Sequence, residues 1–136
     1  MSDNKVYLRW SGEDLRFEGG RPDGPSIQLD SAGEAGPSPM DALLLGVAGC
    51  MGIDVAMILE KGRTPLTSLE VDVEGDRSSE VPRRFTAIRI RYLLGGLDAG
   101  HHEKARRAVD LSREKYCSVL HSLRPDVDLE IRIDYV

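Results

Sequence analysis

Residues 38–62 read SPMDALLLGVAGCMGIDVAMILEKG, and this stretch decides how the rest of the chain is interpreted. It opens with helix-start signals: Ser38 is a good N-cap residue, and the carboxylate of Asp41 three positions later can bond back to it. It closes with a lysine and Gly62, a residue suited to a left-handed helix cap. Nearly every position between these ends is apolar or small, and Asp54 is the clear exception. The pattern predicts one long helix that is buried on several sides.

The composition is that of a soluble globular protein and limits the classes of function. The chain has 136 residues, of which 40% are hydrophobic and 30% charged, with a net charge of -5. This length predicts a single domain over residues 1–136. The negative charge argues against nucleic acid or an anionic membrane surface as the main partner. Residues 1–5 are polar with no apolar signal segment after them, and two aspartates and three glycines interrupt the central helix, so we expect a cytoplasmic protein without a membrane span.

Alternating apolar residues predict strands on both sides of the central helix. Before it, a period of two covers residues 6–10 and 15–17, and a third short strand is predicted at 27–29. After it, the same period predicts three strands, and a one-sided helical stripe over residues 101–123 lies between the last two. Those three strands cover residues 69–74, 88–94 and 127–135. The polar outer faces of the strands favour an α+β fold with one antiparallel sheet of six strands.

A helix that is apolar all round needs more cover than one sheet provides. The second helical region covers another part, and we expect the remainder to pack on a second copy of the chain. This predicts a homodimer with the central helices near the two-fold axis. Gly46, Gly49 and Gly52 would let the backbones approach closely there. Alternatively, these glycines accommodate neighbouring side chains within one subunit.

Two cysteines, Cys50 in the central helix and Cys117 in the second helical region, are the candidates for chemistry. A cysteine in an apolar helix is usually an inert small hydrophobe, because burial raises the pKa of a thiol. A pair of cysteines also suits a thiol that is oxidised to sulfenic acid and a partner that recycles it. The residues alone leave both interpretations open. His121, four residues after Cys117, is either a thiolate partner or a polar residue near a helix end.

No metal site and no cofactor are expected. His101 and His102 are adjacent in the sequence and therefore point in different directions from one helix start. The sequence has no HExxH or CxxC motif, and it has no glycine-rich phosphate-binding motif.

Two segments, SPMDALLLGVAGCMGIDV at residues 38–55 and AVDLSREKYCSV at residues 108–119, resemble the OsmC/Ohr family of osmotically inducible and organic hydroperoxide resistance proteins. The resemblance runs from about residue 6 to residue 135. It is closest to the branch with SPM and an acidic residue before the helix and EKYCSV around the second cysteine. It implies an intertwined homodimer in which antiparallel sheets wrap two central helices and active sites lie at the subunit interface. It also implies that Cys117 opens a short last helical segment.

By this resemblance the protein is a thiol-dependent peroxidase that reduces organic hydroperoxides, with Cys50 as the peroxidatic thiol and Cys117 as the resolving thiol. The two sulfurs would end in a disulfide, which a dithiol reductant (a dihydrolipoyl group in some members of the family) would reopen. The alternative is a non-catalytic OsmC-like dimer that binds a small apolar ligand in the interface pocket.

The sequence departs from the peroxidase pattern at the residues that activate the thiol. The peroxidases usually carry Asn-Pro-Glu before the helix, and that glutamate fixes an arginine beside the thiol. Here Met40 stands at the glutamate position, and Asp41 follows one residue later, rotated by about 100° around the helix. The activating arginine is not assigned, and Arg9, Arg16 and Arg21 are the candidates.

Overall fold

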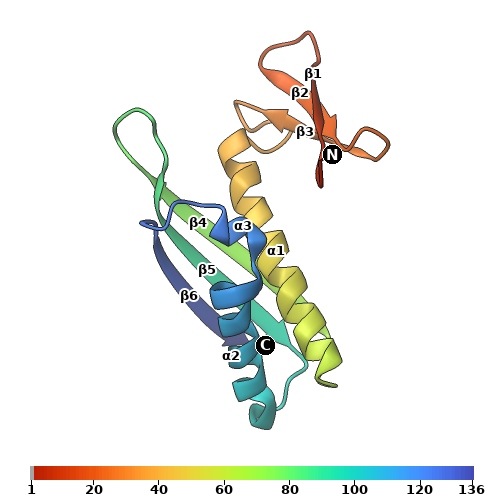
Figure 1. Cartoon of the computed structure of the whole chain (residues 1–136), viewed down its shortest axis with the longest axis vertical. Helices are drawn as coiled ribbons and strands as arrows, with labels where there is room; N and C mark the ends of the chain where they lie inside the picture. Colours follow the sequence, from red (N-terminus) through yellow and green to blue (C-terminus); the bar gives the residue numbers. More distant parts are fainter. Residues whose placement is uncertain (1) are drawn as a thin grey trace. The chain divides into compact units, whose positions relative to one another are not determined.

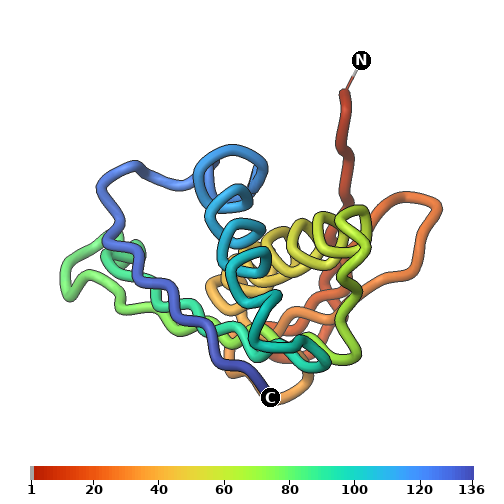
Figure 2. The backbone as a smooth tube through the Cα atoms, turned by 90° about the horizontal axis from the view of Figure 1, so that it is seen from below, coloured from red at the N-terminus to blue at the C-terminus, as the bar shows by residue number. Residues whose placement is uncertain are grey.

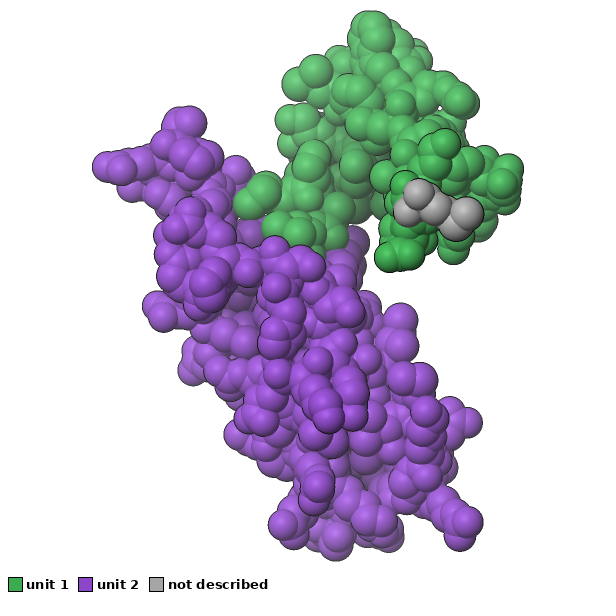
Figure 3. Space-filling view, viewed as in Figure 1, with its two compact units in different colours: residues 1–43 green, residues 44–136 purple. Residues whose placement is uncertain are grey.

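The structure is a computed structural model that describes residues 2–136. The chain divides into two compact units, Met1–Leu43 and Leu44–Val136 (Figure 3). Each unit has its own three-stranded sheet, so the α+β class is confirmed and the expected single sheet of six strands is wrong. The single domain over residues 1–136 stays a prediction.

The sheet of the first unit is an antiparallel meander. It consists of β1 (Tyr7–Trp10), β2 (Arg16–Gly20) and β3 (Ser26–Asp30), in that order. The third strand predicted at residues 27–29 is therefore confirmed, and it pairs along its whole length with β2. Among the described residues these strands pair only with one another, so they form a sheet of their own.

A buried aspartate at the end of β3 organises the loop that leads to the long helix. Asp30 is 2% exposed, and its carboxylate accepts backbone N–H bonds from Ala32, Glu34 and Ala35. The guanidinium of Arg16 lies 3.3 Å from the same carboxylate. These donors lower the pKa of Asp30, with the Ala35 and Ala32 N–H groups as the main causes, so the carboxylate stays charged and holds the loop.

The predicted long helix is present as α1, Pro39–Lys61. At its start Ser38 and Asp41 cap each other: the N–H of each donates to the side-chain oxygen of the other, at 3.1 Å in both cases. The other end differs from the prediction, because Arg63, with φ 58°, and not Gly62 adopts the left-handed conformation. The helix ends at Lys61 as expected, but the N–H of Gly62 still bonds to the Ile58 carbonyl, so the left-handed residue comes one position later than predicted.

The sheet of the second unit is mixed. β4 (Ser68–Arg77) and β5 (Phe85–Gly95) form an antiparallel hairpin, and β6 (Asp128–Tyr135) lies on the other side of β5, parallel to it (Figure 1). The expected fully antiparallel sheet is therefore wrong at this pair. The helical region between β5 and β6 forms a crossover that returns the chain to the same end of the sheet, and such a connection joins parallel strands.

The helical region between β5 and β6 is interrupted. It consists of a 3₁₀ turn η1 (Ala99–His101), the helix α2 (His102–Leu111), a π-helical turn η2 (Ser112–Tyr116) and the short helix α3 (Ser118–His121). A continuous helix over residues 101–123 was expected from periodicity and is wrong. The break falls at Cys117, which has extended backbone angles and opens α3, as the family resemblance implied.

The core of the second unit lies where α1 and α2 cover one face of the β4–β5–β6 sheet (Figures 1 and 2). It is built from apolar side chains of α1, β5 and α2: Val47, Met51, Val55, Leu59, Ile88, Ile90, Tyr92, Leu94, Ala105, Ala108 and Val109. α1 approaches β4 closely at Gly52, where an added Cβ would lie 3.4 Å from the Val71 side chain. Gly46 faces Val119 of the same chain, whereas a Cβ at Gly49 would meet nothing within 4 Å. Gly46 and Gly52 thus accommodate side chains within one subunit.

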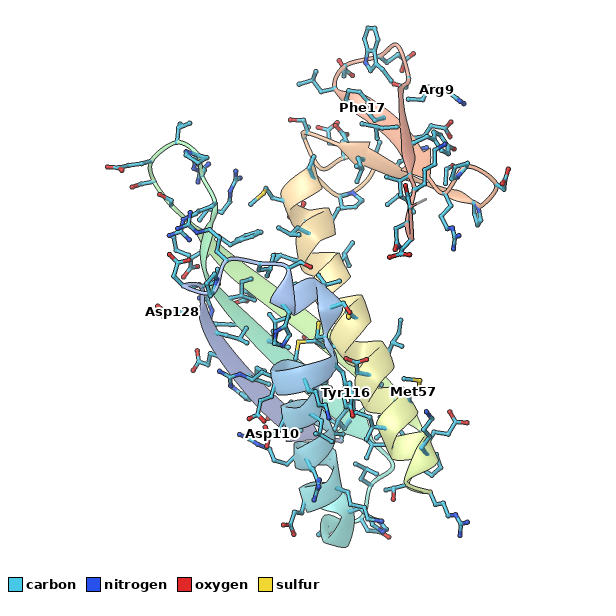
Figure 4. The ribbon with its side chains drawn as sticks, in the orientation of Figure 1. Arg9, Phe17, Met57, Asp110, Tyr116 and Asp128 are labelled. Atoms are coloured by element: carbon cyan, nitrogen blue, oxygen red, sulfur yellow. The ribbon has the colours of Figure 1, made fainter. Side chains whose placement is uncertain are left out.

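The other side of α1 is apolar and exposed in this chain. Leu45 is 59% exposed and Ile53 67% exposed, and Met57 lies on the side of the helix away from α2 (Figure 4). The helix is thus buried on one face only by its own chain. α1 is long and apolar enough to cross a membrane. The core helix of a soluble protein meets the same two criteria, so they do not distinguish the two cases.

Candidate active site

The two cysteines, distant in the sequence, meet in the second unit. Cys50 lies in the middle of α1, and Cys117 lies in the break between η2 and α3. Both are free thiols, and Cys50 is among the groups that shift the pKa of Cys117, so the two belong to one cluster. Cys50 is half-buried and Cys117 is fully buried, at 0% exposed. Cys50 is therefore the thiol that a reagent from solvent can reach, and Cys117 is closed to solvent in this chain.

The π-helical turn sets the position of Cys117. The backbone N–H of Cys117 bonds to the Ser112 carbonyl at 2.8 Å, which closes the wide turn. Its sulfur then accepts the N–H of Leu120 at 3.3 Å and so caps α3. Wide turns of this kind recur at functional sites because the extra residue turns a side chain out of the regular helical path. Here the turn ends at Cys117, which has extended backbone angles.

The environment of Cys117 favours the protonated thiol. Burial is the main cause that raises its pKa, and the hydrogen bond and charge of Cys50 and the charge of Asp54 raise it further. The N–H of Leu120 acts in the opposite direction and lowers the pKa. No cation is among the groups that shift this pKa in the described part of the chain. Cys117 therefore rests as a neutral thiol near neutral pH.

A polar cluster lies beside the two thiols. Asp54 follows Cys50 by one helical turn, and its carboxylate accepts a 2.8 Å hydrogen bond from the hydroxyl of Ser112. Ser112 is fully buried, so this bond is shielded from water. Asp54 was noted in the sequence as the polar exception on α1, and the structure assigns it this partner.

A buried tyrosine hydroxyl completes the cluster. Tyr92 lies on the inward face of β5 at 0% exposed, and among residues 2–136 its hydroxyl has no hydrogen-bond partner. Burial is the main cause that raises the pKa of Tyr92, followed by the negative charges of Cys117, Asp54 and Cys50. The phenol thus stays protonated at any ordinary pH. Sequence reasoning missed Tyr92 as a site residue, although a hydroxyl in the middle of an otherwise aliphatic strand face was the available signal.

The arginines considered for thiol activation all belong to the first unit and have other partners there. Arg16 forms ion pairs with Asp30 at 3.3 Å and Glu34 at 3.2 Å. Arg9 lies 3.5 Å from Glu18 and stacks over the Tyr7 ring. No ion pair is formed by Arg21 among residues 2–136, and its side chain is exposed.

The other polar candidates also act elsewhere. Asp41 is engaged in capping α1. His121 lies with its Nε2 3.0 Å from the Arg113 carbonyl oxygen, and it is not among the groups that shift the pKa of Cys117. The ring of His102 stacks on Tyr135 at 3.5 Å between centroids. Within the described residues, no group of three or more His, Cys, Asp or Glu side chains is arranged to hold a metal ion.

Comparison with known proteins places these features in a family. Residues 31–132, which include both cysteines, match the family model described as OsmC-like protein. The chain is 42% identical over 126 residues to the protein YhfA of Escherichia coli, covering 92% of each sequence. A crystal structure of a hypothetical protein from Aquifex aeolicus is 31% identical, with a TM-score of 0.85 over 100% of this chain and 98% of that one.

A functional name is given to one of the solved structures with lower sequence identity to this chain. The organic hydroperoxide resistance protein OhrB of Bacillus subtilis is 20% identical, with a TM-score of 0.63 and 96% of each chain covered. At this identity the likeness shows a shared fold and no more.

Proposed function

This chain belongs to the OsmC-like protein family, and we propose that it is a thiol-dependent peroxidase that reduces organic hydroperoxides. The observation that carries the proposal is that a half-buried Cys50 and a fully buried Cys117 belong to one cluster, in which Cys50 shifts the pKa of Cys117. A reachable thiol with a second thiol behind it is the arrangement that a two-cysteine peroxidase needs. The name of OhrB among the structural neighbours supports the substrate class.

The proposed reaction begins at Cys50. Its sulfur, as thiolate, attacks the outer oxygen of the hydroperoxide, so that an S–O bond forms as the O–O bond breaks. The sulfur loses two electrons to the peroxide, and the inner oxygen leaves as an alkoxide that takes up a proton and becomes an alcohol. Cys50 is then a sulfenic acid.

The second step uses Cys117. Its sulfur attacks the sulfur of the sulfenic acid, the S–S bond forms, and the hydroxyl group leaves with the Cys117 proton as water. A dithiol reductant, for which a dihydrolipoyl group is the proposed example, reopens the disulfide by two exchange steps. The proposed catalytic residues are therefore Cys50 and Cys117, and no metal takes part.

The activation of Cys50 in this proposal differs from the family pattern. Met40 has no charge, Asp41 is bonded to the N–H of Ser38, and Arg16 is paired with two carboxylates. We therefore propose a slower reaction with hydroperoxide than in members that carry the glutamate–arginine pair. To activate the Cys50 thiol, a cation from another part of the chain or from a second subunit would have to take the place of that pair.

We also propose that the working unit is a homodimer. α1 exposes a stripe of large apolar side chains, including Leu45, Ile53 and Met57, that its own chain leaves uncovered. Such a stripe on a soluble protein favours a protein partner, and a second copy of the same helix is the simplest one.

Peroxide consumption in the presence of a dithiol tests the proposed function. The wild type should consume an organic hydroperoxide, Cys50→Ser should fall to the uncatalysed rate, and Cys117→Ser should stop after a single turnover with sulfenic acid on Cys50. A Cys50→Ser rate equal to that of the wild type would remove Cys50 from the reaction.

A second candidate function is binding of a small apolar ligand without catalysis. It is favoured by the environment of Cys117. Burial is the main cause that raises the pKa of this thiol, and none of the described groups that shift this pKa is a cation. If the wild type consumes no hydroperoxide and keeps both thiols reduced, this second function replaces the first.

A further inference from the structure

One hydrogen bond joins the helix that carries Cys50 to the segment that carries Cys117. The Ser112 hydroxyl donates to the Asp54 carboxylate at 2.8 Å, across 58 positions of sequence. Asp54 follows Cys50 by four residues in α1, so the two side chains lie on the same side of the helix, about 6 Å apart along its axis. Ser112 opens the π-helical turn η2 that leads to Cys117. The bond therefore connects the two segments within a few residues of each thiol.

The carbonyl of the same serine holds the backbone of Cys117. The Cys117 N–H donates to the Ser112 carbonyl at 2.8 Å, and the Cys117 sulfur accepts the Leu120 N–H at 3.3 Å. Ser112 thus bonds to α1 through its side chain and to Cys117 through its backbone. These hydrogen bonds form a continuous connection from α1 to Cys117, and each of them has an ordinary length.

The segment around Cys117 needs such a connection because it has little regular structure of its own. The helix α3 is four residues long, and η2 is a single wide turn. Helical pieces this short are not stable by themselves, so tertiary bonds fix their place. The Ser112–Asp54 bond suits this task, since Ser112 is fully buried and the bond is shielded from water. A disulfide holds its two Cβ atoms about 3.5–4.5 Å apart, so a small displacement of one segment would hinder its formation.

We infer that the Ser112–Asp54 hydrogen bond holds the Cys117 segment against α1 and thereby raises the effective concentration of the Cys117 thiol at Cys50. Ser112 and Asp54 are positioning residues, since neither side chain forms or breaks a covalent bond in the reaction. The inference rests on the proposed pairing of the two cysteines. Fixing two reacting groups in place before they react removes part of the entropy cost of joining them. Without the bond, the segment would have to be ordered as the disulfide closes.

Equilibrium with glutathione measures this effective concentration in the whole chain, without any peroxide. The Cys50 thiolate attacks one sulfur of oxidised glutathione and releases one reduced glutathione; the Cys117 thiolate then attacks the Cys50 sulfur of the mixed disulfide and releases a second. The two protein thiols give up two electrons and two protons, which the two released glutathione thiols carry. Samples equilibrated at a series of glutathione ratios are quenched with acid, alkylated and analysed by mass spectrometry. The equilibrium constant has the unit of a concentration and is the quantity compared between variants.

Ser112→Ala should lower this equilibrium constant by about tenfold, because one shielded hydrogen bond to a charged acceptor is lost. Asp54→Ala removes the other partner and should lower the constant to a similar extent. The double variant should lose no more than the larger of the two single losses, since both substitutions break the same bond. Near neutral pH the Cys117 thiol is protonated, so the effect of the Asp54 charge on its pKa does not enter the comparison. Circular dichroism checks that each variant is folded, and if Ser112→Ala unfolds, Asp54→Ala carries the test.

Two control variants separate positioning from a general loss of stability. Ser122→Ala removes an exposed hydroxyl that bonds to the Ser118 carbonyl at 2.8 Å, next to α3. Ile88→Val shortens a buried core side chain of β5 and should lower the unfolding temperature. Both controls should keep the equilibrium constant of the wild type.

Folded Ser112→Ala and Asp54→Ala variants with the wild-type equilibrium constant would overturn the inference, and so would an equal fall in Ile88→Val. The proposed function fails separately. If the wild type consumes no organic hydroperoxide, yet the constant falls in Ser112→Ala and Asp54→Ala, the positioning role is retained and the peroxidase is lost. A wild type that forms no Cys50–Cys117 disulfide at any glutathione ratio would remove the pairing and the inference together.

Discussion

The bond between Ser112 and Asp54 gives the clearest prediction about stability. Ser112→Ala removes a fully buried hydroxyl that donates to the Asp54 carboxylate at 2.8 Å. The small methyl group of alanine fits the space, so the main loss is one shielded hydrogen bond to a charged acceptor. Such bonds contribute about 1.5–3 kcal/mol, a sizeable part of a typical unfolding free energy.

Urea denaturation measures this loss. We expect the midpoint of Ser112→Ala to fall by about 1 M with an unchanged slope, because only the native state is affected. Ser122→Ala is the matched control: its hydroxyl also bonds at 2.8 Å, to the Ser118 carbonyl, but it is exposed, so its effect should stay within about 0.5 kcal/mol. Combination with Asp54→Asn should give a coupling energy above about 0.5 kcal/mol. Equal midpoints for Ser112→Ala and the wild type, or strict additivity with Asp54→Asn, would refute the reasoning.

Three more predictions concern the same clusters. Asp54→Asn removes a negative charge that raises the pKa of Cys117, so the rate at which an alkylating reagent modifies Cys117 in the Cys50→Ser background should rise at a given pH; an unchanged rate would contradict that charge effect. Tyr92→Phe should leave the free energy of unfolding unchanged or raise it by up to about 1–3 kcal/mol in urea titrations, and a clear loss would mean that the hydroxyl has a partner. The pKa of Asp30 is lowered in the folded chain, so the unfolded chain binds more protons in acid; stability of Met1–Leu43 should be complete above the ordinary value of 3.8 and decline as pH falls below it. Amide exchange against pH should show this decline, and Asp30→Asn should remove it.

The parts of the fold that depend on local signals could be predicted from the sequence. The start of α1 is an example, because Ser38 and Asp41 cap each other through bonds that span only three residues. The strands likewise follow from alternation, which is a property of consecutive residues. The short strand at residues 27–29 was found in this way and is β3.

The parts that depend on distant segments could not be predicted. Alternation in β6 is the same whether the strand runs parallel or antiparallel to β5, so only the path of the intervening helices decides. The break at Cys117 was likewise invisible to periodicity, because α2 and α3 keep apolar residues at helical spacing on either side of the π turn. The family resemblance supplied it.

The role of the two cysteines stays a prediction, and the residues around them were missed. Cys50 and Cys117 were named from the motifs around them, and in the structure Cys50 is among the groups that shift the pKa of Cys117. Ser112 and Tyr92 come from two further segments, and each reads alone as an ordinary helix or strand residue. Their place in the cluster with Asp54 and Cys117 depends on the packing of α1, η2 and β5.

The place of β6 beside β5 has a consequence for how a new chain folds. β4 and β5 are joined by a short loop and can pair early. β6 can pair with β5 only after the helical crossover between them has folded back. As synthesis proceeds, α1 leaves the ribosome well before the segment that carries Cys117. During that interval Cys117 is not yet available to Cys50. An oxidant would then convert Cys50 to a sulfenic acid that cannot form a disulfide with Cys117. Pulse-labelled amide exchange would reveal this order if the β6 amides become protected last.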